Sequence, residues 1–402
     1  MEKLTLGFLG TGHMGSAIAR RLIAYPLLLN NRTLAKAKAL AEELPSAQIE
    51  DPIVILKKAN FVFLGVKPSD MEALGRQLSG IKSSAILVSM AAGLTLDSLS
   101  SIFPHHRLIR IMPNTPVAVG KGITFVAYGN VSEKDKATFA SIMEPCGKLV
   151  EIEEKDIDAG SVLTGSAPAY LDFFLDALAE AGASLGLSKQ DALNYVLAMA
   201  EGTVALAKDS DFSVKQLGQQ VCSPGGSTIE GVEVLLNKGL YPDLALAAAS
   251  TYYKNKALGG TYHFVGASDA LVTPIDPAFT KVLNPYRLYE LLSDLWSKDT
   301  CAPRMAHNWS KENKTLGQCS ITAFLVQDIF GGEVYGVPLG DGAFHCFNKV
   351  GDKIFDLTSE QFLPEILTYS LSYPQSREVH FAKEEKRLRY EALRLSLLKA
   401  IS

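Results

Sequence analysis

The sequence predicts an α/β fold: an N-terminal doubly wound parallel sheet, then an all-helical domain, then a small α+β domain. From Leu4 to about Val150, short apolar runs alternate with helical patterns, as in a parallel sheet covered on both faces. From residue 153 to 258 the strand patterns disappear, and beyond residue 286 helices and strands are mixed. A chain of 402 residues also exceeds the size at which a single core stops growing. We therefore predict domains at 1–152, 153–258 and 286–402, with a linker at 259–285.

The composition favours small-molecule chemistry. Hydrophobic residues make up 47% and charged residues 20%, and the net charge of −4 gives no reason to expect nucleic acid or an anionic membrane as a partner. The N-terminal apolar run breaks at Gly10, so it suits neither a secretory signal nor a membrane span. Five scattered cysteines without a CxxC pair indicate reduced thiols and no metal site. We expect a cytoplasmic protein.

Seven strands are predicted in the N-terminal domain, with helices between most of them. Each strand is a short apolar run, as expected for strands that are buried on both faces. The predicted strands are 4–9, 26–29, 61–66, 85–89, 108–112, 123–127 and 148–151. Ligands of open parallel sheets bind at the carboxyl ends of the strands, so the residues that follow these runs are the candidate site residues.

A glycine-rich loop follows the first strand. Gly10-Thr11-Gly12-His13-Met14-Gly15 lies between a strand and a helix, the context that makes a G-x-G-x-x-G motif informative. Gly10 permits a tight turn, Gly12 lets the backbone approach a pyrophosphate, and Gly15 lets the helix pack closely on the strand. The start of the helix adds N–H groups and partial positive charge. The motif predicts a Rossmann dinucleotide site, with His13 as a surface side chain beside the cofactor and not a catalytic group.

The residues after the second strand favour NADP over NAD. An NAD site usually has an acidic residue here for the ribose hydroxyl, but this chain has Asn31-Arg32-Thr33. Arg32, with Asn31 and Thr33 as neutral donors, suits the 2′-phosphate of NADP. The alternative is that Arg32 is only a solvated charge at the start of a helix.

Three further strand ends carry candidate cofactor residues. Val66-Lys67-Pro68 lies at the end of the third predicted strand, and Ala91 follows the fourth. Lys67 suits a phosphate or ribose contact, although a lysine at a strand exit is often only solvated. Asn114, held between prolines after the fifth strand, is placed to meet the nicotinamide carboxamide or the substrate.

The middle of the chain predicts helices with more than one apolar stripe. Tyr170, Phe173 and Phe174 begin one helical face, and the predicted helices are 169–185, 189–208, 214–221, 228–238 and 242–256. Apolar residues beyond one stripe predict a partner subunit that covers them.

A second motif suits a small anion. Ser223-Pro224-Gly225-Gly226-Ser227-Thr228 places hydroxyls around a Pro-Gly-Gly turn at the predicted start of a helix. Backbone N–H groups at a helix start, with adjacent hydroxyls, suit a carboxylate. The alternative is an ordinary capped helix without a ligand.

Together these motifs resemble the pyrroline-5-carboxylate reductase family over roughly residues 1–258, with further matches at 110–116 and 165–170. The resemblance implies a Rossmann domain followed by a helical domain that interlocks with a second subunit. It also implies reduction of 1-pyrroline-5-carboxylate to L-proline by NADPH or NADH, the last step of proline synthesis. Ser223 and the Gly225–Thr228 segment would then hold the substrate, with the Thr228 hydroxyl near the ring nitrogen. Ala167 and Ser227 depart from the usual glycine and threonine, which affects only local packing.

An alternative within the oxidoreductases is a β-hydroxyacid dehydrogenase, which uses a catalytic lysine in its helical part. The segment 165–170 offers no lysine, which disfavours that alternative.

The C-terminal region predicts a different unit, with helices at 287–296, 318–330 and 383–401 and strands at 334–337, 343–348 and 353–356. Cys319, His345 and Asp356 follow one another as nucleophile, base and orienting group do, in a chain order similar to papain-like and transglutaminase-like folds. The region also resembles the YunG-like family in its Gly-Gln-Cys, His and Asp-Leu-Thr segments. Three interpretations stay open: a buried structural cysteine, a cysteine hydrolase or acyltransferase, and a binding module. For the whole chain the alternative is a bifunctional or regulatory protein on a degenerate reductase scaffold.

Overall fold

The computed structural model describes residues 4–258, 264–266, 272–339, 342–362 and 367–402. The chain divides into two compact units, Met1–Thr251 and Tyr252–Ser402. The division of the first unit at residue 152 and the limits of the linker stay predictions. Among the described residues, no helix is both long enough and apolar enough to span a membrane.

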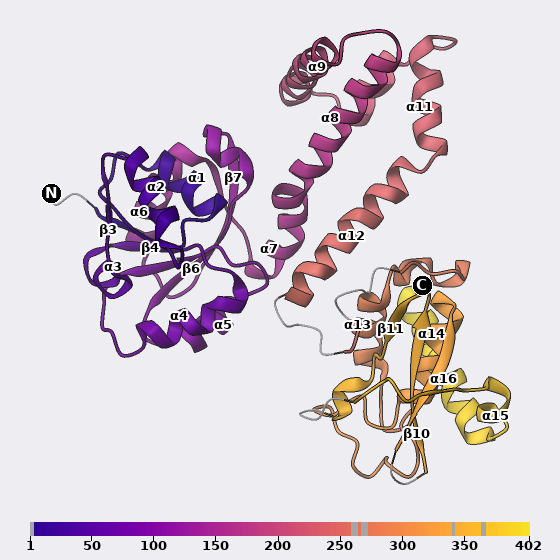
Figure 1. Cartoon of the computed structure of the whole chain (residues 1–402). Helices are drawn as coiled ribbons and strands as arrows, with labels where there is room; N and C mark the ends of the chain where they lie inside the picture. The colour runs from indigo at the N-terminus through magenta and orange to yellow at the C-terminus, as the bar shows by residue number, and fades with distance from the viewer. Residues whose placement is uncertain (1–3, 259–263, 267–271, 340–341, 363–366) are drawn as a thin grey trace. The chain divides into compact units, whose positions relative to one another are not determined.

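The first unit contains an eight-stranded sheet in the order β3-β2-β1-β4-β5-β6-β7-β8 (Figure 1). The strands are β1 (Leu6–Leu9), β2 (Leu27–Asn30), β3 (Ala47–Ile49), β4 (Phe61–Leu64), β5 (Ile86–Ser89), β6 (Arg107–Met112), β7 (Gly122–Tyr128) and β8 (Gly147–Glu151). All seven predicted strands are confirmed, but the short and largely exposed β3 was not predicted.

One strand pair corrects the prediction of a fully parallel sheet, because β6 and β7 are antiparallel. Between them lies only the short 3₁₀ helix η2 (Thr115–Val119). A parallel pair needs a crossover of a dozen or more residues, so this short connection returns the chain in the opposite direction.

Helices cover both faces of the sheet, as expected for a doubly wound fold. On one face, α1 (His13–Arg21), α2 (Leu34–Glu43) and α6 (Glu133–Met143) share an apolar cluster in which Phe8 stacks on Phe63 at 4.8 Å between ring centroids. On the other face, α3 (Pro52–Lys58), α4 (Met71–Leu78) and α5 (Leu96–Ile102) close a second cluster (Figure 1). Short 3₁₀ helices η1 (Pro68–Asp70) and η3 (Glu144–Cys146) complete the connections.

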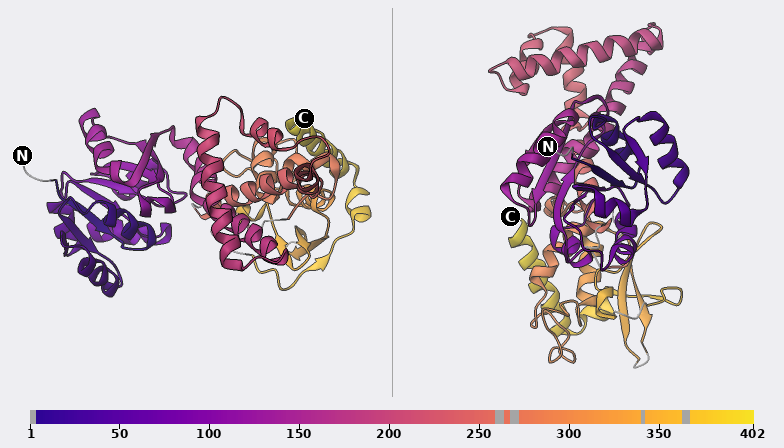
Figure 2. Two further views of the ribbon diagram at one scale, coloured as in Figure 1. Left: turned by 90° about the horizontal axis from the view of Figure 1, so that it is seen from above. Right: turned by 90° about the vertical axis from the view of Figure 1, so that its left-hand side faces the viewer.

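The rest of the first unit is helical, which confirms the predicted change of texture. After α7 (Glu154–Ser161) and a π-helical turn (Val162–Ser166) come α8 (Ala167–Ser184), α9 (Lys189–Asp209), α10 (Val214–Val221), α11 (Ser227–Asn237) and α12 (Leu240–Leu258). Near the start of α8, the Tyr170 hydroxyl is hydrogen-bonded to the Thr251 hydroxyl of α12; both helices are labelled in Figure 1, and Figure 2 gives two further views of the chain.

These helices bury little of their own apolar surface. From α8 to α11 the buried hydrophobic side chains among the described residues are Ala179 and Ala192. Large apolar side chains point to solvent instead, with Phe173 76% and Leu185 86% exposed. A helical segment of this kind requires a partner surface.

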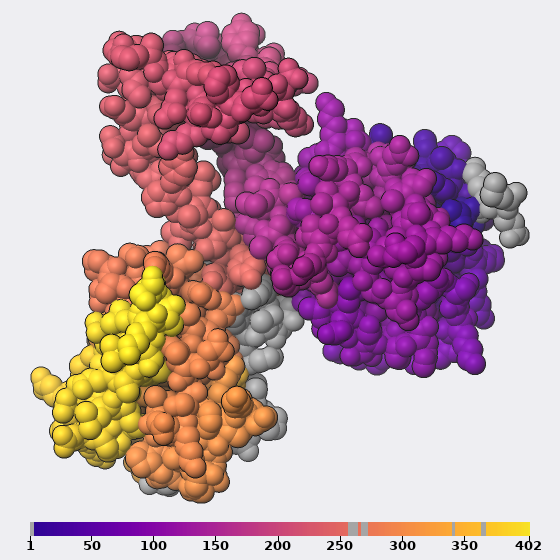
Figure 3. All heavy atoms as spheres, turned by 180° about the vertical axis from the view of Figure 1, so that it is seen from behind, coloured from indigo at the N-terminus to yellow at the C-terminus, as the bar shows by residue number. Residues whose placement is uncertain are grey.

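The second unit is an α+β body, drawn in orange and yellow in Figure 3. Its antiparallel sheet has the order β11-β10-β9-β12, formed by β9 (Glu333–Pro338), β10 (Phe344–Val350), β11 (Lys353–Phe355) and β12 (Tyr373–Pro374). Its helices are α13 (Pro285–Leu295), α14 (Cys319–Phe330), α15 (Arg377–Phe381) and α16 (Glu384–Ile401), with 3₁₀ turns η6 (Pro277–Val282) and η7 (Ser359–Phe362). The short β12 and α15 were not predicted. Helix α14 packs on β10, and its apolar residues are almost all buried.

Part of the predicted linker packs inside this unit. Phe264 is buried against Tyr286 and Tyr289, at 5.9 and 5.2 Å between ring centroids. The Val265 carbonyl accepts a hydrogen bond of 3.0 Å from the Asp356 N–H. Other linker residues, 259–263 and 267–271, lie outside the described residues.

Candidate functional site

The glycine loop has the geometry that its sequence predicts. Gly10 has a φ of 106°, and a Cβ there would lie 2.5 Å from the backbone of Gly65, so only glycine fits. A Cβ on Gly15 would lie 2.4 Å from the Gly10 carbonyl oxygen, which is why α1 approaches the loop so closely. Gly12 differs, because a Cβ there would meet nothing within 4 Å. Contact with the protein therefore does not account for a glycine at this position.

The Asn31 side chain, directly after the second strand, holds this loop in place. Asn31 accepts a hydrogen bond from the Thr11 N–H at 3.0 Å and donates one to the Thr33 carbonyl at 3.0 Å. The Asn31 amide therefore braces the loop. The Thr11 hydroxyl is buried without a hydrogen-bond partner, an orphaned polar atom at the centre of the loop.

Arg32 reaches across the strand ends to Asp70. The two side chains form an ion pair of 3.2 Å, with Arg32 83% exposed. At this exposure the pair is worth little, so Arg32 is available to an anionic ligand. Thr33, which follows Arg32, and Lys67, three residues before Asp70, are exposed. Val66 and Pro68 are half-buried.

The other predicted cofactor residues lie along the same edge of the sheet. Strand register aligns Leu9 with Asn30 and Leu64, and Leu64 with Ser89. The loop 10–15, the segments 31–33 and 66–68, and Ala91 all follow these aligned ends. Ala91 is buried and its N–H donates to the Ser89 hydroxyl at 3.3 Å. The sheet thus brings residues from separate segments to one rim.

Asn114 is also at this rim, but its side chain has a structural partner. Its carbonyl oxygen accepts a hydrogen bond of 2.9 Å from the Ile123 N–H, which ties the start of β7 to the end of β6. The residue is buried at 6% exposure.

A buried ion pair that the sequence analysis missed lies beside the rim. Arg110 is 1% exposed and pairs with Glu154 at 3.2 Å and with Asp158 at 2.7 Å. It joins β6 to α7, the first helix after the sheet. Charged residues within an apolar strand and at a helix start were the available signal, but their pairing depends on the fold.

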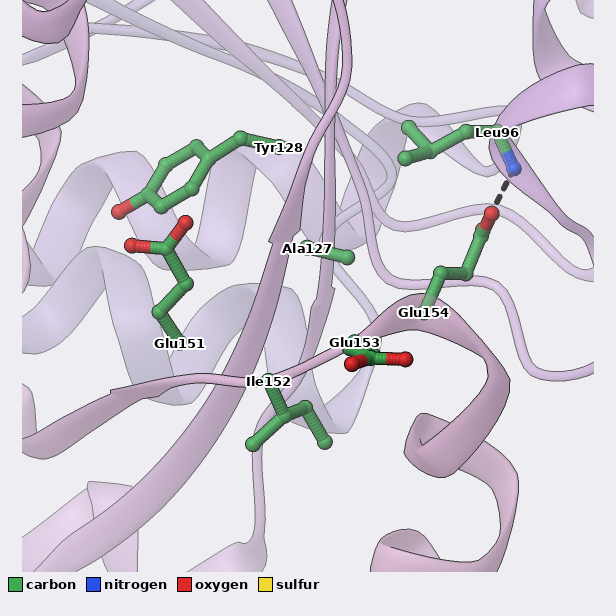
Figure 4. Close-up of a pocket in the computed structure, with 7 residues that line it drawn as sticks. All are labelled: Leu96, Ala127, Tyr128, Glu151, Ile152, Glu153 and Glu154. Atoms are coloured by element: carbon green, nitrogen blue, oxygen red, sulfur yellow. Dashed lines mark hydrogen bonds between the residues drawn. The ribbon is translucent and has the colours of Figure 1, made fainter.

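A shallow pocket of about 410 Å³ lies elsewhere on the first unit (Figure 4). It is lined by Leu96, Ala127, Tyr128, Glu151, Ile152, Glu153 and Glu154. The Glu154 carboxylate accepts a hydrogen bond of 2.6 Å from the Leu96 N–H. None of the predicted site residues lines this pocket, and its carboxylates repel phosphates and carboxylates, so we do not assign the ligand site to it.

The second predicted motif forms an exposed turn at the start of α11. Gly225 has a φ of 70°, and the Gly226 N–H donates to the Ser223 carbonyl at 2.9 Å. Ser223, Ser227 and Thr228 are exposed. No side chain caps α11, so its first N–H groups face outward and are available to an anion.

In the second unit the three predicted residues come together. His345 Nε2 lies 2.6 Å from Asp356 Oδ2, and both side chains are buried. Cys319 begins α14, and its thiol is close enough to the His345 and Cys346 side chains for both to affect its pKa. Asp356 is further held by the Thr358 N–H and hydroxyl, each at 3.1 Å, and by the Tyr369 hydroxyl at 2.7 Å. Thr358 lies in the Asp-Leu-Thr segment, whereas nothing in the sequence pointed to Tyr369.

The electrostatics of this cluster favour a separated charge pair. The Cys346 hydrogen bond and the positive charge of His345 hold the pKa of Cys319 well below its usual range, against the opposing effect of burial. Burial lowers the pKa of His345, but the charges of Asp356 and Cys319 outweigh it and raise that pKa to about 10. Both shifts favour the charged forms, because a Cys319 thiolate and a His345 imidazolium stabilise one another.

Taken as a whole, the first unit has the features of a dinucleotide-binding oxidoreductase: a glycine loop at the carboxyl edge of a doubly wound sheet, followed by helices made for association. Residues 5–93 match the family model for NADP oxidoreductase, coenzyme F420-dependent, and residues 154–258 match that for pyrroline-5-carboxylate reductase dimerisation.

Known relatives narrow this class to one family. The chain is 32% identical over 261 residues to pyrroline-5-carboxylate reductase of Aquifex aeolicus, covering 63% of this chain and 97% of that protein. It is 33% identical to the Escherichia coli enzyme over 267 residues, covering 64% and 99%. The chain belongs to the pyrroline-5-carboxylate reductase family.

Solved structures agree with this assignment. The Streptococcus pyogenes reductase matches with a TM-score of 0.60 at 31% identity, covering 63% of this chain and 98% of that one. The Plasmodium falciparum enzyme, solved with NADP bound, matches with a TM-score of 0.58 at 30% identity, covering 64% and 99%. These matches do not favour a β-hydroxyacid dehydrogenase or a degenerate scaffold.

The C-terminal part has a separate relationship. Residues 284–402 match the family model for the YunG protein. The reductase relatives are matched over nearly their whole length while about a third of this chain is left over, so the second unit is an addition to the reductase.

Proposed function

We propose that this protein reduces 1-pyrroline-5-carboxylate to L-proline, with NADPH as the preferred reductant. The observation that carries the proposal is Gly12: a Cβ there would meet no protein atom, in a loop whose other two glycines are both explained by contact with the protein. We infer the identity of the substrate from the membership of this chain in the reductase family.

The rim residues fit a dinucleotide. Gly10, Thr11, Gly12, His13, Met14 and Gly15 would lie along the pyrophosphate, with the N–H groups of α1 and the orphaned Thr11 hydroxyl as donors. Arg32 and Thr33 would hold the 2′-phosphate, with Asn31 bracing the loop behind them. Val66, Lys67, Pro68, Ala91 and Asn114 would border the rest of the cofactor. NAD lacks the 2′-phosphate and would bind without the contribution of Arg32.

The turn at 223–228 would hold the substrate. Ser223, Gly225, Gly226 and Ser227 offer hydroxyl and backbone donors at a helix start, which suit the substrate carboxylate. The bound nicotinamide supplies the hydride that adds to the imine carbon. The Thr228 hydroxyl would then be the hydrogen-bond partner of the ring nitrogen, and we assign it the catalytic role of orienting this nitrogen as it becomes an amine.

A second copy of the chain completes the enzyme. The exposed apolar side chains of α8 to α11 and the match to a dimerisation family both support a homodimer or a higher oligomer. We further propose that the protein acts in the cytoplasm, because all five cysteines are free thiols, as expected in a reducing compartment.

The test is oxidation of NADPH by the full chain, with and without 1-pyrroline-5-carboxylate. We expect oxidation that depends on the substrate, with a lower KM for NADPH than for NADH. Thr228→Ala should lower kcat/KM about 100-fold and Thr228→Ser should restore most of it. Thr138→Ala, on a helix of the sheet domain outside the site, is the matched control. No substrate-dependent oxidation would refute the proposal.

A further inference from the structure

We propose that the second unit is an acyl-transfer enzyme in which Cys319 is the nucleophile, His345 the acid–base and Asp356 the positioning residue. Its substrates are carbonyl compounds with a leaving group: esters, thioesters or amides. This activity is separate from the reductase and does not depend on it.

Cys319 is the least buried member of the cluster. The residue has intermediate exposure, whereas its partners His345, Cys346 and Asp356 are each about 1% exposed. It occupies the first position of α14, a helix of 12 residues, so the N–H groups of the first turn stabilise negative charge at the sulfur and on an attacked carbonyl oxygen.

The histidine is fixed in one orientation. Its Nε2 is bound to Asp356, which leaves Nδ1 as the ring nitrogen for Cys319. The Phe362 ring meets the imidazole edge-on at 4.7 Å between centroids. Asp356 accepts four hydrogen bonds in total, from His345, Tyr369 and the Thr358 N–H and hydroxyl. A carboxylate held so fully orients the imidazole and stabilises its protonated form.

A purely structural role does not account for this arrangement. Buried ion pairs contribute little net stability, because desolvation offsets their attraction. An apolar trio would pack the same space without that cost. A buried histidine that is paired with a carboxylate, beside a cysteine whose pKa is lowered, is instead the arrangement that nucleophilic catalysis uses.

A second observation concerns unpaired polar atoms of residues close in sequence to Cys319. Gln318, directly before Cys319, is fully buried, and its Nε2 donates to the Ser297 carbonyl at 2.9 Å. Its Oε1 has no hydrogen-bond partner, and neither does the buried Thr315 hydroxyl. Unpaired buried polar atoms are costly, so we assign them to contacts with the bound substrate or its water.

The reaction balances with water as the second substrate. The Cys319 thiolate attacks the carbonyl carbon and forms a C–S bond, while the carbonyl π electrons move to oxygen. As the carbonyl reforms, the bond to the leaving group breaks, and His345 gives its proton to that group. Water then attacks the thioester, His345 takes a proton from it, and the thiolate leaves. The products are a carboxylic acid and an alcohol, thiol or amine.

The test uses the full chain with three acetyl donors: p-nitrophenyl acetate, an acetyl thioester of N-acetylcysteamine, and acetyl p-nitroanilide. We expect a burst of the leaving group, an acetyl adduct on the peptide that contains Cys319, and then steady turnover with at least one donor. Cys319→Ala should reduce turnover about 100-fold or more. Cys222→Ala, at another partly exposed free cysteine, is the matched control and should change neither the burst nor turnover.

The Asp356→Asn variant distinguishes a role of Asp356 in positioning His345 from a role in folding. If Asp356 supports the charged imidazole, the variant should move the alkaline limb of the pH–rate profile to lower pH, whereas general loss of structure would lower the rate equally at every pH. The circular dichroism spectrum of Cys319→Ala, which should match that of the natural sequence, checks that the variant is folded. Absence of a Cys319 adduct with all three donors, or equal turnover by Cys319→Ala, would overturn the proposal. Substrate-dependent NADPH oxidation, measured on the same samples, reports the reductase independently.

Discussion

Replacing Gly12 by alanine tests the assignment of the cofactor site most directly. The new Cβ meets no protein atom within 4 Å, and the backbone φ of −73° suits alanine. Loss of glycine from the N-cap costs up to about 1 kcal/mol. Reduced freedom of the unfolded chain offsets about 0.4–1 kcal/mol of this cost. We therefore expect the free energy of unfolding to change by less than about 0.5 kcal/mol.

The effect on cofactor binding should be much larger. A methyl group between the loop and a pyrophosphate prevents close approach of the backbone N–H groups, and loss of one or two charge-assisted hydrogen bonds, about 1.5–3 kcal/mol each, weakens binding about tenfold to a hundredfold or more.

The assay is isothermal titration of NADPH together with thermal unfolding, with Gly15→Ala as the control. A Cβ on Gly15 would lie 2.4 Å from the Gly10 carbonyl oxygen, so that variant should lose about 1–3 kcal/mol of stability as well as affinity. If Gly12→Ala binds NADPH as tightly as the natural sequence, the pyrophosphate does not lie against Gly12 and the reasoning fails.

Four further predictions concern separate features. Arg32→Ala should raise the KM for NADPH about tenfold and leave that for NADH unchanged, whereas Asp70→Asn, which frees Arg32 from its partner, should not raise either. Arg110→Met leaves two partly buried carboxylates without their cation and should cost about 3 kcal/mol in urea unfolding. Phe173→Glu, at a side chain 76% exposed in one copy, should shift the protein toward monomers in light scattering. Because the pKa of His345 is raised from 6.5 to about 10, its contribution to stability is complete below about pH 6.5 and is lost as the pH rises through about 10, which thermal unfolding against pH will show.

Local patterns predicted much of the fold. Buried strands such as 61–64 are continuous apolar runs, and α10 spans Val214–Val221, the range predicted for this helix. The missed elements β3, β12 and α15 are three, two and five residues long, with too few side chains to show a period.

The candidate sites likewise contain features that local sequence predicts and contacts that depend on the fold. The glycine loop was identified in sequence because its three glycines have a fixed spacing between a strand and a helix. By contrast, the pairing of Arg32 with Asp70 and of Arg110 with Asp158 joins residues 38 and 48 positions apart, so only the folded sheet brings them together.

The order of the sheet, helical and α+β regions, the glycine loop, the turn at 223–228 and the three residue types of the second site could all be found in the sequence, because each depends on short-range periodicity or on a motif within a few residues. Folding was needed to show that Asn31 braces the loop, that β7 runs antiparallel to β6, and that His345 lies between Asp356 and Cys319. These depend on strand register and on the packing of α14 against β10, which set the distances and the burial that determine the charge on each group.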